Sequence, residues 1–300
     1  MWLIFAILTV LLWGTSETIF KSVSNNEKNT VLKLIASNGL MLGLFGLIFM
    51  IITKTEMNFE ILKTYFPVAI IYITSMFCTY KAMRLVKISI LSPVQNSSCL
   101  ITTILCVAIL KQELAIYQII AIAMIIIGMI LLSINKDETK RLDMGEGEEK
   151  ISKAKAYSLY LQGFLFALGY FVLDGVASFL DDYTLEANLS AEQVLIAYSF
   201  IYAAIGAICL AYLLISKKWG KFEWKTERKK LIGTVVEAAG QYTYIYAYAF
   251  GEAALASPFI ASYSIVSIIL SRIFLKEKLC KKQWILISII LVGMIMLSIE

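Results

Sequence analysis

Two stretches set the class of this protein: 117-YQIIAIAMIIIGMILLSI-134 and 284-WILISIILVGMIMLSI-299. Neither contains a charged residue, and an apolar run of about 18 residues is long enough to cross the hydrocarbon core of a bilayer as a helix. The whole 300-residue chain is 59% hydrophobic and 16% charged, whereas a soluble domain carries about 25% charged residues. The sequence therefore predicts an integral membrane protein that lies in a lipid bilayer.

Further segments of similar length and apolar character accompany these two, each bounded by charged residues or a turn. They predict an all-α integral membrane fold of about ten transmembrane helices. No positively charged stretch precedes the first segment, so we interpret it as a retained helix rather than a cleaved signal peptide. The predicted spans are 2–20, 32–53, 64–84, 89–110, 114–134, 156–180, 191–216, 231–250, 254–275 and 281–299.

An internal repeat relates the two halves of the chain. A shift of 165 residues, from Ser92 to Ser257, superimposes Ser92-Pro93 on Ser257-Pro258, 110-LKQEL-114 on 275-LKEKL-279 and 128-GMILLSI-134 on 293-GMIMLSI-299. We therefore predict a first five-helix repeat at 1–134, a polar linker at 135–155 and a second five-helix repeat at 156–300. Because each repeat has an odd number of helices, the second copy is inverted in the membrane, with a substrate site between the copies.

The distribution of Lys and Arg predicts the orientation. Most of the 27 basic residues fall in the odd-numbered loops, including 217-KKWGKFEWKTERKK-230. Cytoplasmic loops carry an excess of Lys and Arg, so we predict a multi-pass protein of the cell membrane with both termini outside. The basic loops account for the pI of about 8.8 without a nucleic-acid partner.

The residue inventory excludes several kinds of chemistry. The chain has no histidine, which rules out Ser-His-Asp triads and histidine-based proton relays. Its five cysteines are scattered without CxxC pairing and are expected to be buried small residues. We expect no cofactor, no metal ligands and no catalytic residues.

Three acidic residues fall inside predicted spans: Glu17, Asp174 and Glu237. A carboxylate in a membrane is costly unless it is paired, protonated or faces water, so such residues are candidates for a functional site. We expect them to bind a cationic group of a substrate or to exchange a proton with it. In the alternative interpretation, Glu17 pairs with Lys21 one turn away.

Asp174 also has a structural alternative. It falls near the end of its predicted span, close to Asp181 and Asp182. In that interpretation all three carboxylates lie at the outer membrane interface.

The eighth span contains a polar stripe within 237-EAAGQYTYIYAYAF-250. Glu237, Gln241, Tyr244 and Tyr248 recur at i, i+4, i+7 and i+11, which places them on one helix face. Facing a cavity, they could hold an amino acid or an organic cation through hydrogen bonds and cation–π contacts. Alternatively, Tyr246 and Tyr248 are anchors at the membrane interface.

The first half supplies counterparts. Trp13, Tyr72 and Tyr80 are the candidate aromatic residues of the substrate site, and Gln95 is a candidate polar residue in the fourth span. Gln95 and its neighbour Asn96 could instead hydrogen-bond between helices as packing contacts.

Small and acidic residues elsewhere have structural interpretations. Gly39, Gly43 and Gly46 permit a close helix approach, either within one protomer or in a homodimer. Glu113 and Glu277 are interpreted as structural turn or gate contacts rather than substrate ligands.

Several motifs resemble the drug/metabolite transporter superfamily, specifically its ten-helix EamA-type branch. The segment 12-LWGTSETIFK-21 is similar to the first helix of that family, which typically reads WGxxxxxxK. The segments 109-ILKQELAIYQIIAIAMIIIGMILL-132 and 274-FLKEKLCKKQWILISIILVGMIML-297 resemble its repeat-ending pattern of a turn with Glu, then Gln, then a Gly-bearing helix. The resemblance implies a secondary transporter or exporter of small metabolites without a covalent cofactor.

Together these features predict a secondary active transporter, an exporter that moves a small amphipathic metabolite by alternating access. The expected substrate is an amino acid or organic cation, with proton coupling through Glu17 or Glu237. The alternatives are a lipid scramblase, a sensor, or an intramembrane enzyme acting on lipid head groups.

Overall fold

The described residues form ten helical spans, two of which are interrupted, in agreement with the prediction. The structure, a computed structural model, describes residues 1–24, 29–110, 116–133, 153–186, 189–219, 223–251 and 253–297. Within these ranges it contains helices and no strand. The helices are α1 (Trp2–Ser24), α2 (Thr30–Thr53), α3 (Phe59–Met83), α4 (Ile88–Asn96), α5 (Cys99–Leu110), α6 (Ile116–Ser133), α8 (Lys153–Glu186), α9 (Ala191–Ile215), α10 (Trp224–Phe250), α11 (Ala253–Ala261), α12 (Tyr263–Phe274) and α13 (Lys281–Leu297).

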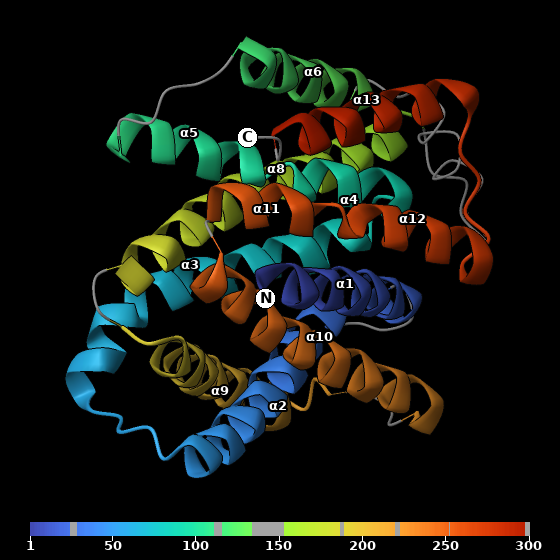
Figure 1. The fold of residues 1–300 in the computed structure, drawn as a ribbon. Coiled ribbons are helices and arrows are strands. Elements are labelled where there is room, and N and C mark those ends of the chain that lie inside the picture. Colours follow the sequence, from blue (N-terminus) through green and yellow to red (C-terminus); the bar gives the residue numbers. More distant parts are fainter. Residues whose placement is uncertain are drawn as a thin grey trace.

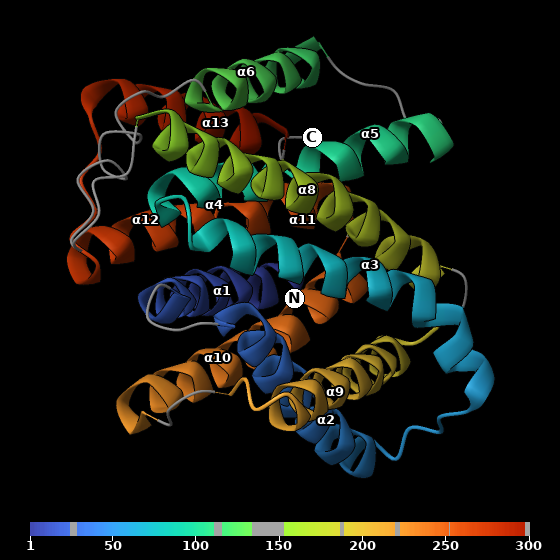
Figure 2. The same cartoon turned by 180° about the vertical axis from the view of Figure 1, so that it is seen from behind.

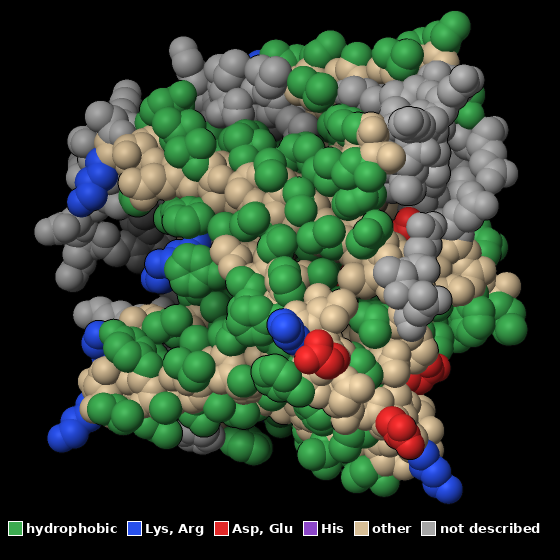
Figure 3. Space-filling view, turned by 90° about the vertical axis from the view of Figure 1, so that its left-hand side faces the viewer, with side chains coloured by type: hydrophobic (Ala, Val, Ile, Leu, Met, Phe, Trp, Pro, Cys, Tyr) green, Lys and Arg blue, Asp and Glu red, His purple; other side chains and the backbone are tan. Residues whose placement is uncertain are grey.

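The apolar helices have the length that a membrane requires. Six described segments are long and apolar enough to cross a bilayer, and two shorter apolar helices accompany them. Hydrophobic side chains are spread over the described part of the face in Figure 3, and charged side chains are few there. The protein is therefore a multi-pass membrane protein, while its orientation and the membrane that contains it stay predictions.

The helix pairings follow the internal repeat. Helix α2 packs on α9 and α6 packs on α13, and each pair joins equivalent helices of the two halves. Helix α1 packs on α10, and its counterpart α8 packs on α3. Figure 1 shows the α2–α9 pair at one end of the molecule and the α6–α13 pair at the other. The division into two five-helix repeats stays a prediction, and the predicted linker 135–155 lies almost wholly outside the described residues.

The fourth and ninth spans are interrupted, which the sequence interpretation did not foresee. The first break lies at Ser97 and Ser98, between α4 and α5. There the Ser97 hydroxyl donates to the carbonyl oxygen of Pro93 at 2.7 Å, and the Ser98 N–H bonds Gln95 O, three residues back, at 3.0 Å. Such local hydrogen bonds tighten and bend a helix. The second break, at Ser262, lies between α11 and α12.

Several helices begin earlier or end later than predicted. Helix α3 begins at Phe59 rather than 64 because the Asn58 side chain caps it, accepting from the N–H of Ile61 at 2.9 Å. Helix α8 continues to Glu186 rather than 180, and α10 begins at Trp224 rather than 231. The predicted ends were wrong because charged residues were assigned to loops, whereas α8 and α10 extend through such residues.

Glycines of α2 serve packing within the protomer. A Cβ atom on Gly39 would lie 2.3 Å from the carbonyl oxygen of Tyr202, and one on Gly43 would lie 2.5 Å from the Cβ of Ala203. Both neighbours belong to α9, so these two glycines bring α2 and α9 together. A homodimer therefore has no support from these positions and stays an untested prediction.

Candidate functional site

A buried cavity lies where α1, α3, α8, α10 and α12 meet, and we refer to it as the central cavity. Its volume is about 40 Å³, which is room for a few water molecules. Seven of the ten predicted site residues line it. The lining consists of Trp13, Glu17, Phe20, Tyr72, Met76, Thr79, Tyr80, Met83, Tyr170, Asp174, Glu237, Gln241 and Tyr263.

A second, polar cavity lies next to the central one, beside the break between α4 and α5. Its volume is about 30 Å³, and it shares Trp13, Tyr170, Asp174 and Tyr263 with the central cavity. We refer to it as the side cavity. The other lining residues are Asn96, Ser98, Cys99, Ser178, Tyr244, Tyr248, Ser257, Ile260 and Ala261.

Glu17 bridges the two interrupted spans. Its carboxylate accepts a hydrogen bond from Ser92 Oγ on α4 at 2.7 Å and another from Ser267 Oγ on α12. The ammonium group of Lys21, one turn further along α1, donates to the carbonyl oxygens of Met83 and Val86. Glu17 therefore connects the cavity wall to both of the helical spans that are broken.

Asp174 and Glu237 complete a group of three carboxylates at the central cavity. Ser98 Oγ donates to Asp174 at 2.7 Å, and Ser16 Oγ donates to Glu237. Asp174 lines both cavities, and its depth in the membrane stays a prediction. No lysine or arginine in the described ranges lines either cavity. The site is thus rich in hydrogen-bond acceptors.

Trp13 forms an aromatic wall between the two cavities. Its ring centroid lies 5.0 Å from that of Tyr244 and 5.8 Å from that of Tyr263. Its indole N–H is buried without a hydrogen-bond partner. The indole packs against Gly240, where a Cβ atom would lie 2.4 Å from Trp13 Cδ1. A buried, unpaired donor at a cavity is placed to bind a polar ligand.

The predicted polar stripe of α10 faces the cavities. Glu237 and Gln241 line the central cavity, while Tyr244 and Tyr248 line the side cavity. Tyr248 is 4% exposed, so its alternative role as an interfacial anchor is wrong. Tyr246 faces elsewhere and donates to Glu192 at the start of α9 at 3.0 Å.

Gln95 lies apart from the other predicted site residues. It is buried, and Thr79 Oγ1 donates to its side-chain oxygen at 2.9 Å. Thr79 lines the central cavity and Gln95 does not appear in the lining of either cavity. Its contact joins α4 to α3, as the packing alternative expected.

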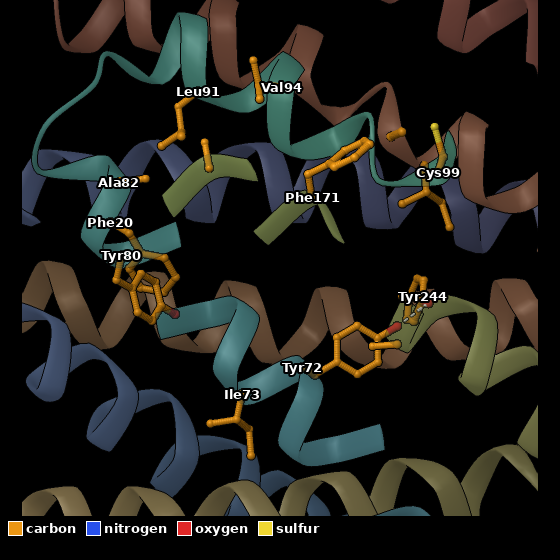
Figure 4. Close-up of a cluster of buried hydrophobic side chains, with 14 of the residues drawn as sticks. Phe20, Tyr72, Ile73, Tyr80, Ala82, Leu91, Val94, Cys99, Phe171 and Tyr244 are labelled. Carbon is orange, nitrogen blue, oxygen red and sulfur yellow. Dashed lines mark hydrogen bonds between the residues drawn. The ribbon is translucent and has the colours of Figure 1, made fainter. Parts of the chain in front are cut away.

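Asp181 is a buried carboxylate whose position the sequence interpretation missed. It is fully buried and accepts hydrogen bonds from Tyr65 at 2.5 Å, Tyr72 at 2.8 Å and Tyr244 at 3.4 Å. The phenols of Tyr72 and Tyr244 also lie 2.8 Å apart, and Figure 4 shows them pointing toward one another. The missed signal is that 174, 178 and 181 share one helix face at i, i+4 and i+7.

Glu277 has the structural role that its turn position predicted. Its carboxylate accepts from the N–H groups of Ile88 at 3.1 Å and Ser89 at 3.0 Å, and from Ser89 Oγ at 2.6 Å. It therefore caps the N-terminus of α4. Glu113, the other acidic turn residue, lies outside the described residues.

Comparison with known proteins places this chain in a family. A family model described as “Sugar transport protein” matches residues 4–300. A solved structure described only as “Crystal structure of protein” is 16% identical, with a TM-score of 0.62 over 98% of this chain and 94% of that chain, and it shares the fold. No curated protein matches the chain.

The family is part of the drug/metabolite transporter superfamily, so the resemblance noted in the sequence is confirmed at that level, and the EamA-type branch stays a prediction. The alternative of an intramembrane enzyme is excluded. The chain belongs to the sugar transport protein family and is a membrane transporter.

Proposed function

We propose that this protein is a secondary active transporter that carries a sugar through the central cavity by alternating access. The observation that supports this substrate is the pairing of acceptor-rich walls with aromatic rings. Glu17, Asp174 and Glu237 offer carboxylate oxygens to sugar hydroxyl groups, and Gln241 offers both a donor and an acceptor. The face of Trp13 can pack against the apolar face of a sugar ring. The family description supports the same substrate class.

The size of the cavity supports a conformational cycle. About 40 Å³ admits a few waters but not a sugar ring, so the helices must separate before a substrate enters. In transporters built from repeats, rocking of one bundle against the other opens a central site to one side at a time. The contacts between α1 and α10 and between α3 and α8 are the interfaces that would move.

An organic cation or an amino acid is the second candidate substrate. The three carboxylates favour it, because no described lysine or arginine at the cavities balances their charge. A sugar is preferred because the remaining polar lining groups are neutral phenols, a hydroxyl, an amide and an indole.

The direction and coupling of transport form the finer part of the proposal. Export across the cell membrane follows from the superfamily resemblance. Proton coupling would act through Glu17 or Glu237. Glu17 is the better placed because its two serine donors belong to the two interrupted spans.

Thermal unfolding of the purified protein against a ligand panel tests the substrate class. The panel contains neutral monosaccharides, amino acids and organic cations, and a bound ligand at about 100 times its Kd should stabilise the protein by roughly 2.7 kcal/mol. We expect stabilisation by monosaccharides that is lost in Glu237→Gln and retained in Glu60→Gln, which changes an exposed carboxylate at the start of α3. Stabilisation by cations alone would replace the sugar with the second candidate.

A further inference from the structure

Asp181 lies between the two cavities and one face of the molecule. That face is the one at which α3 begins, near residues 54–58, and at which α8 ends. Tyr65 is six residues into α3, or roughly 9 Å from its start along the axis. Asp181 is five residues before the end of α8. Figure 2 shows α3 and α8 running side by side, and the two helices are packed together.

Three phenols from two helices converge on the Asp181 carboxylate. Tyr65 and Tyr72 belong to α3 and donate at 2.5 and 2.8 Å, while Tyr244 of α10 lies at 3.4 Å. Tyr72 also lies within hydrogen-bonding distance of Ser178 on α8, at 3.2 Å. The four groups of this cluster, which we call the Asp181 cluster, are at most 5% exposed. The cluster therefore ties α3 of the first half to α8 and α10 of the second.

Two of the four residues of the Asp181 cluster line the cavities, and the other two lie behind them. Tyr72 lines the central cavity and Tyr244 lines the side cavity, while neither Asp181 nor Tyr65 appears in either lining. A substrate in the cavities would thus contact Tyr72 and Tyr244, which Asp181 holds in place. Hydrogen bonds from neutral donors to a carboxylate are stronger than those between neutral groups, and in a buried network they strengthen one another.

A second set of contacts joins helices at the opposite end of the molecule, where α4 begins. There Glu277 joins the loop after α12 to the N-terminus of α4, and the hydroxyls of Ser89 and Ser271 lie 2.8 Å apart. These contacts hold α4 against α12 and the loop that follows it at that end. Opening toward the start of α3 requires α3 to separate from α8, which breaks the bonds of Tyr65 and Tyr72 to Asp181.

We propose that the Asp181 cluster is the gate that closes the transport site toward the face at which α3 begins. Asp181 is its positioning residue, since it acts through Tyr65, Tyr72 and Tyr244 rather than by touching substrate. The inference rests on the proposed alternating-access function. It adds a residue that sets the balance between the closed state and the state open toward that face.

Cys99 provides a native reporter of this gate. It lines the side cavity and is 1% exposed, so a hydrophilic thiol reagent reaches it only when a gate opens. The experiment applies a membrane-impermeant thiol reagent to the side of proteoliposomes that presents residues 54–58. The rate of modification of the Cys99 peptide is then measured by mass spectrometry.

Tyr65→Phe is the first variant because it removes one hydrogen bond and keeps the ring. We expect Cys99 to be modified at least about tenfold faster than in the protein without the substitution, as expected for one lost hydrogen bond to a charged group. The matched control is Tyr183→Phe on α8, where the phenol is exposed. Asp181→Asn, which weakens all three bonds, should accelerate modification further in the same direction.

If Cys99 is modified at the same rate in Tyr65→Phe as in Tyr183→Phe, the gate proposal is wrong. This comparison does not depend on whether Asp181→Asn folds. Thermal unfolding of the same variants with the ligand panel distinguishes the gate proposal from the proposal that the substrate is a sugar. Faster modification without stabilisation by sugars keeps the gate and removes the sugar substrate. Stabilisation by sugars with an unchanged rate keeps the substrate and removes the gate.

Discussion

At the scale of the residue, serine hydroxyls hold the carboxylates of the site. Ser92 and Ser267 donate to Glu17, Ser98 donates to Asp174, and Ser16 donates to Glu237. Such neutral donors satisfy a carboxylate without neutralising it, which leaves its remaining lone pairs available to a ligand. The three acidic residues stood out in the sequence because charge is rare in a membrane span. Their serine partners did not, because serine is common in such spans and the contacts join distant segments.

Trp13 supplies the first test at this scale. Trp13→Phe keeps an aromatic ring but removes the buried indole N–H, which has no partner within the protein. We expect sugar affinity to fall about tenfold, the effect of one lost hydrogen bond of about 1.4 kcal/mol. Titration calorimetry measures it, with Trp224→Phe as the control because Trp224 is 68% exposed. Equal affinities in the two variants would remove Trp13 from the binding site.

Glu17 is the residue at which proton coupling can be tested. Glu17→Gln cannot gain or lose a proton, so we expect uptake driven by a pH gradient to be abolished. Exchange of sugar across the membrane without a gradient should persist, since Glu237 and Asp174 remain. Proteoliposome uptake measures both, with the exposed Glu60→Gln as control. Uptake by Glu17→Gln that still follows the pH gradient would assign coupling to another group.

At the scale of the element, small residues and broken helices shape the site. The ten spans were predictable because long apolar runs dominate the sequence. The interruptions at Ser97–Ser98 and Ser262 were not, since they depend on backbone bonds shifted to three residues back. Asp181 was missed for a related reason. The predicted sixth span ended at 180, whereas α8 continues to Glu186 and keeps Asp181 on a buried face.

Gly240 makes room on α10 for the indole of Trp13. A Cβ at this position would lie 2.4 Å from Trp13 Cδ1 and 2.6 Å from its Nε1, so Gly240→Ala must displace the ring toward the cavities. We expect at least a tenfold loss of sugar affinity with folding retained, since alanine favours a helix more than glycine does. Binding calorimetry and the melting temperature are measured together. Unchanged affinity would show that the indole has room to move without harm.

Gly39 makes the close approach of α2 to α9 possible. Its Cβ would lie 2.3 Å from a backbone oxygen of α9, which cannot turn aside as a side chain can. We expect Gly39→Ala to destabilise the protein by about 1–3 kcal/mol, measured by unfolding in mixed micelles. Gly169→Ala is the control because its nearest neighbour is the flexible Cys78 side chain at 3.3 Å. Equal stabilities would contradict the tight α2–α9 interface.

At the scale of the whole molecule, the site exists only when the two halves are assembled. The central cavity takes its walls from α1 and α3 of the first half and from α8, α10 and α12 of the second. The repeat in the sequence predicted a site between the halves, and the structure brings seven of the ten predicted residues together at the central cavity, while their part in binding stays a prediction. The pairing of α1 with α10 and of α3 with α8 was not predictable from the sequence, since packing between helices in a membrane depends on their surfaces in three dimensions.

The central claim is that a sugar crosses the membrane through the central cavity, and counterflow in proteoliposomes tests it most directly. Vesicles loaded with an unlabelled monosaccharide are diluted into a trace of the labelled one, so neither the coupling ion nor the direction of transport matters. We expect transient accumulation of the label, abolished in Glu237→Gln and retained in Glu60→Gln. Counterflow of amino acids or organic cations, with none for any monosaccharide, would contradict the account.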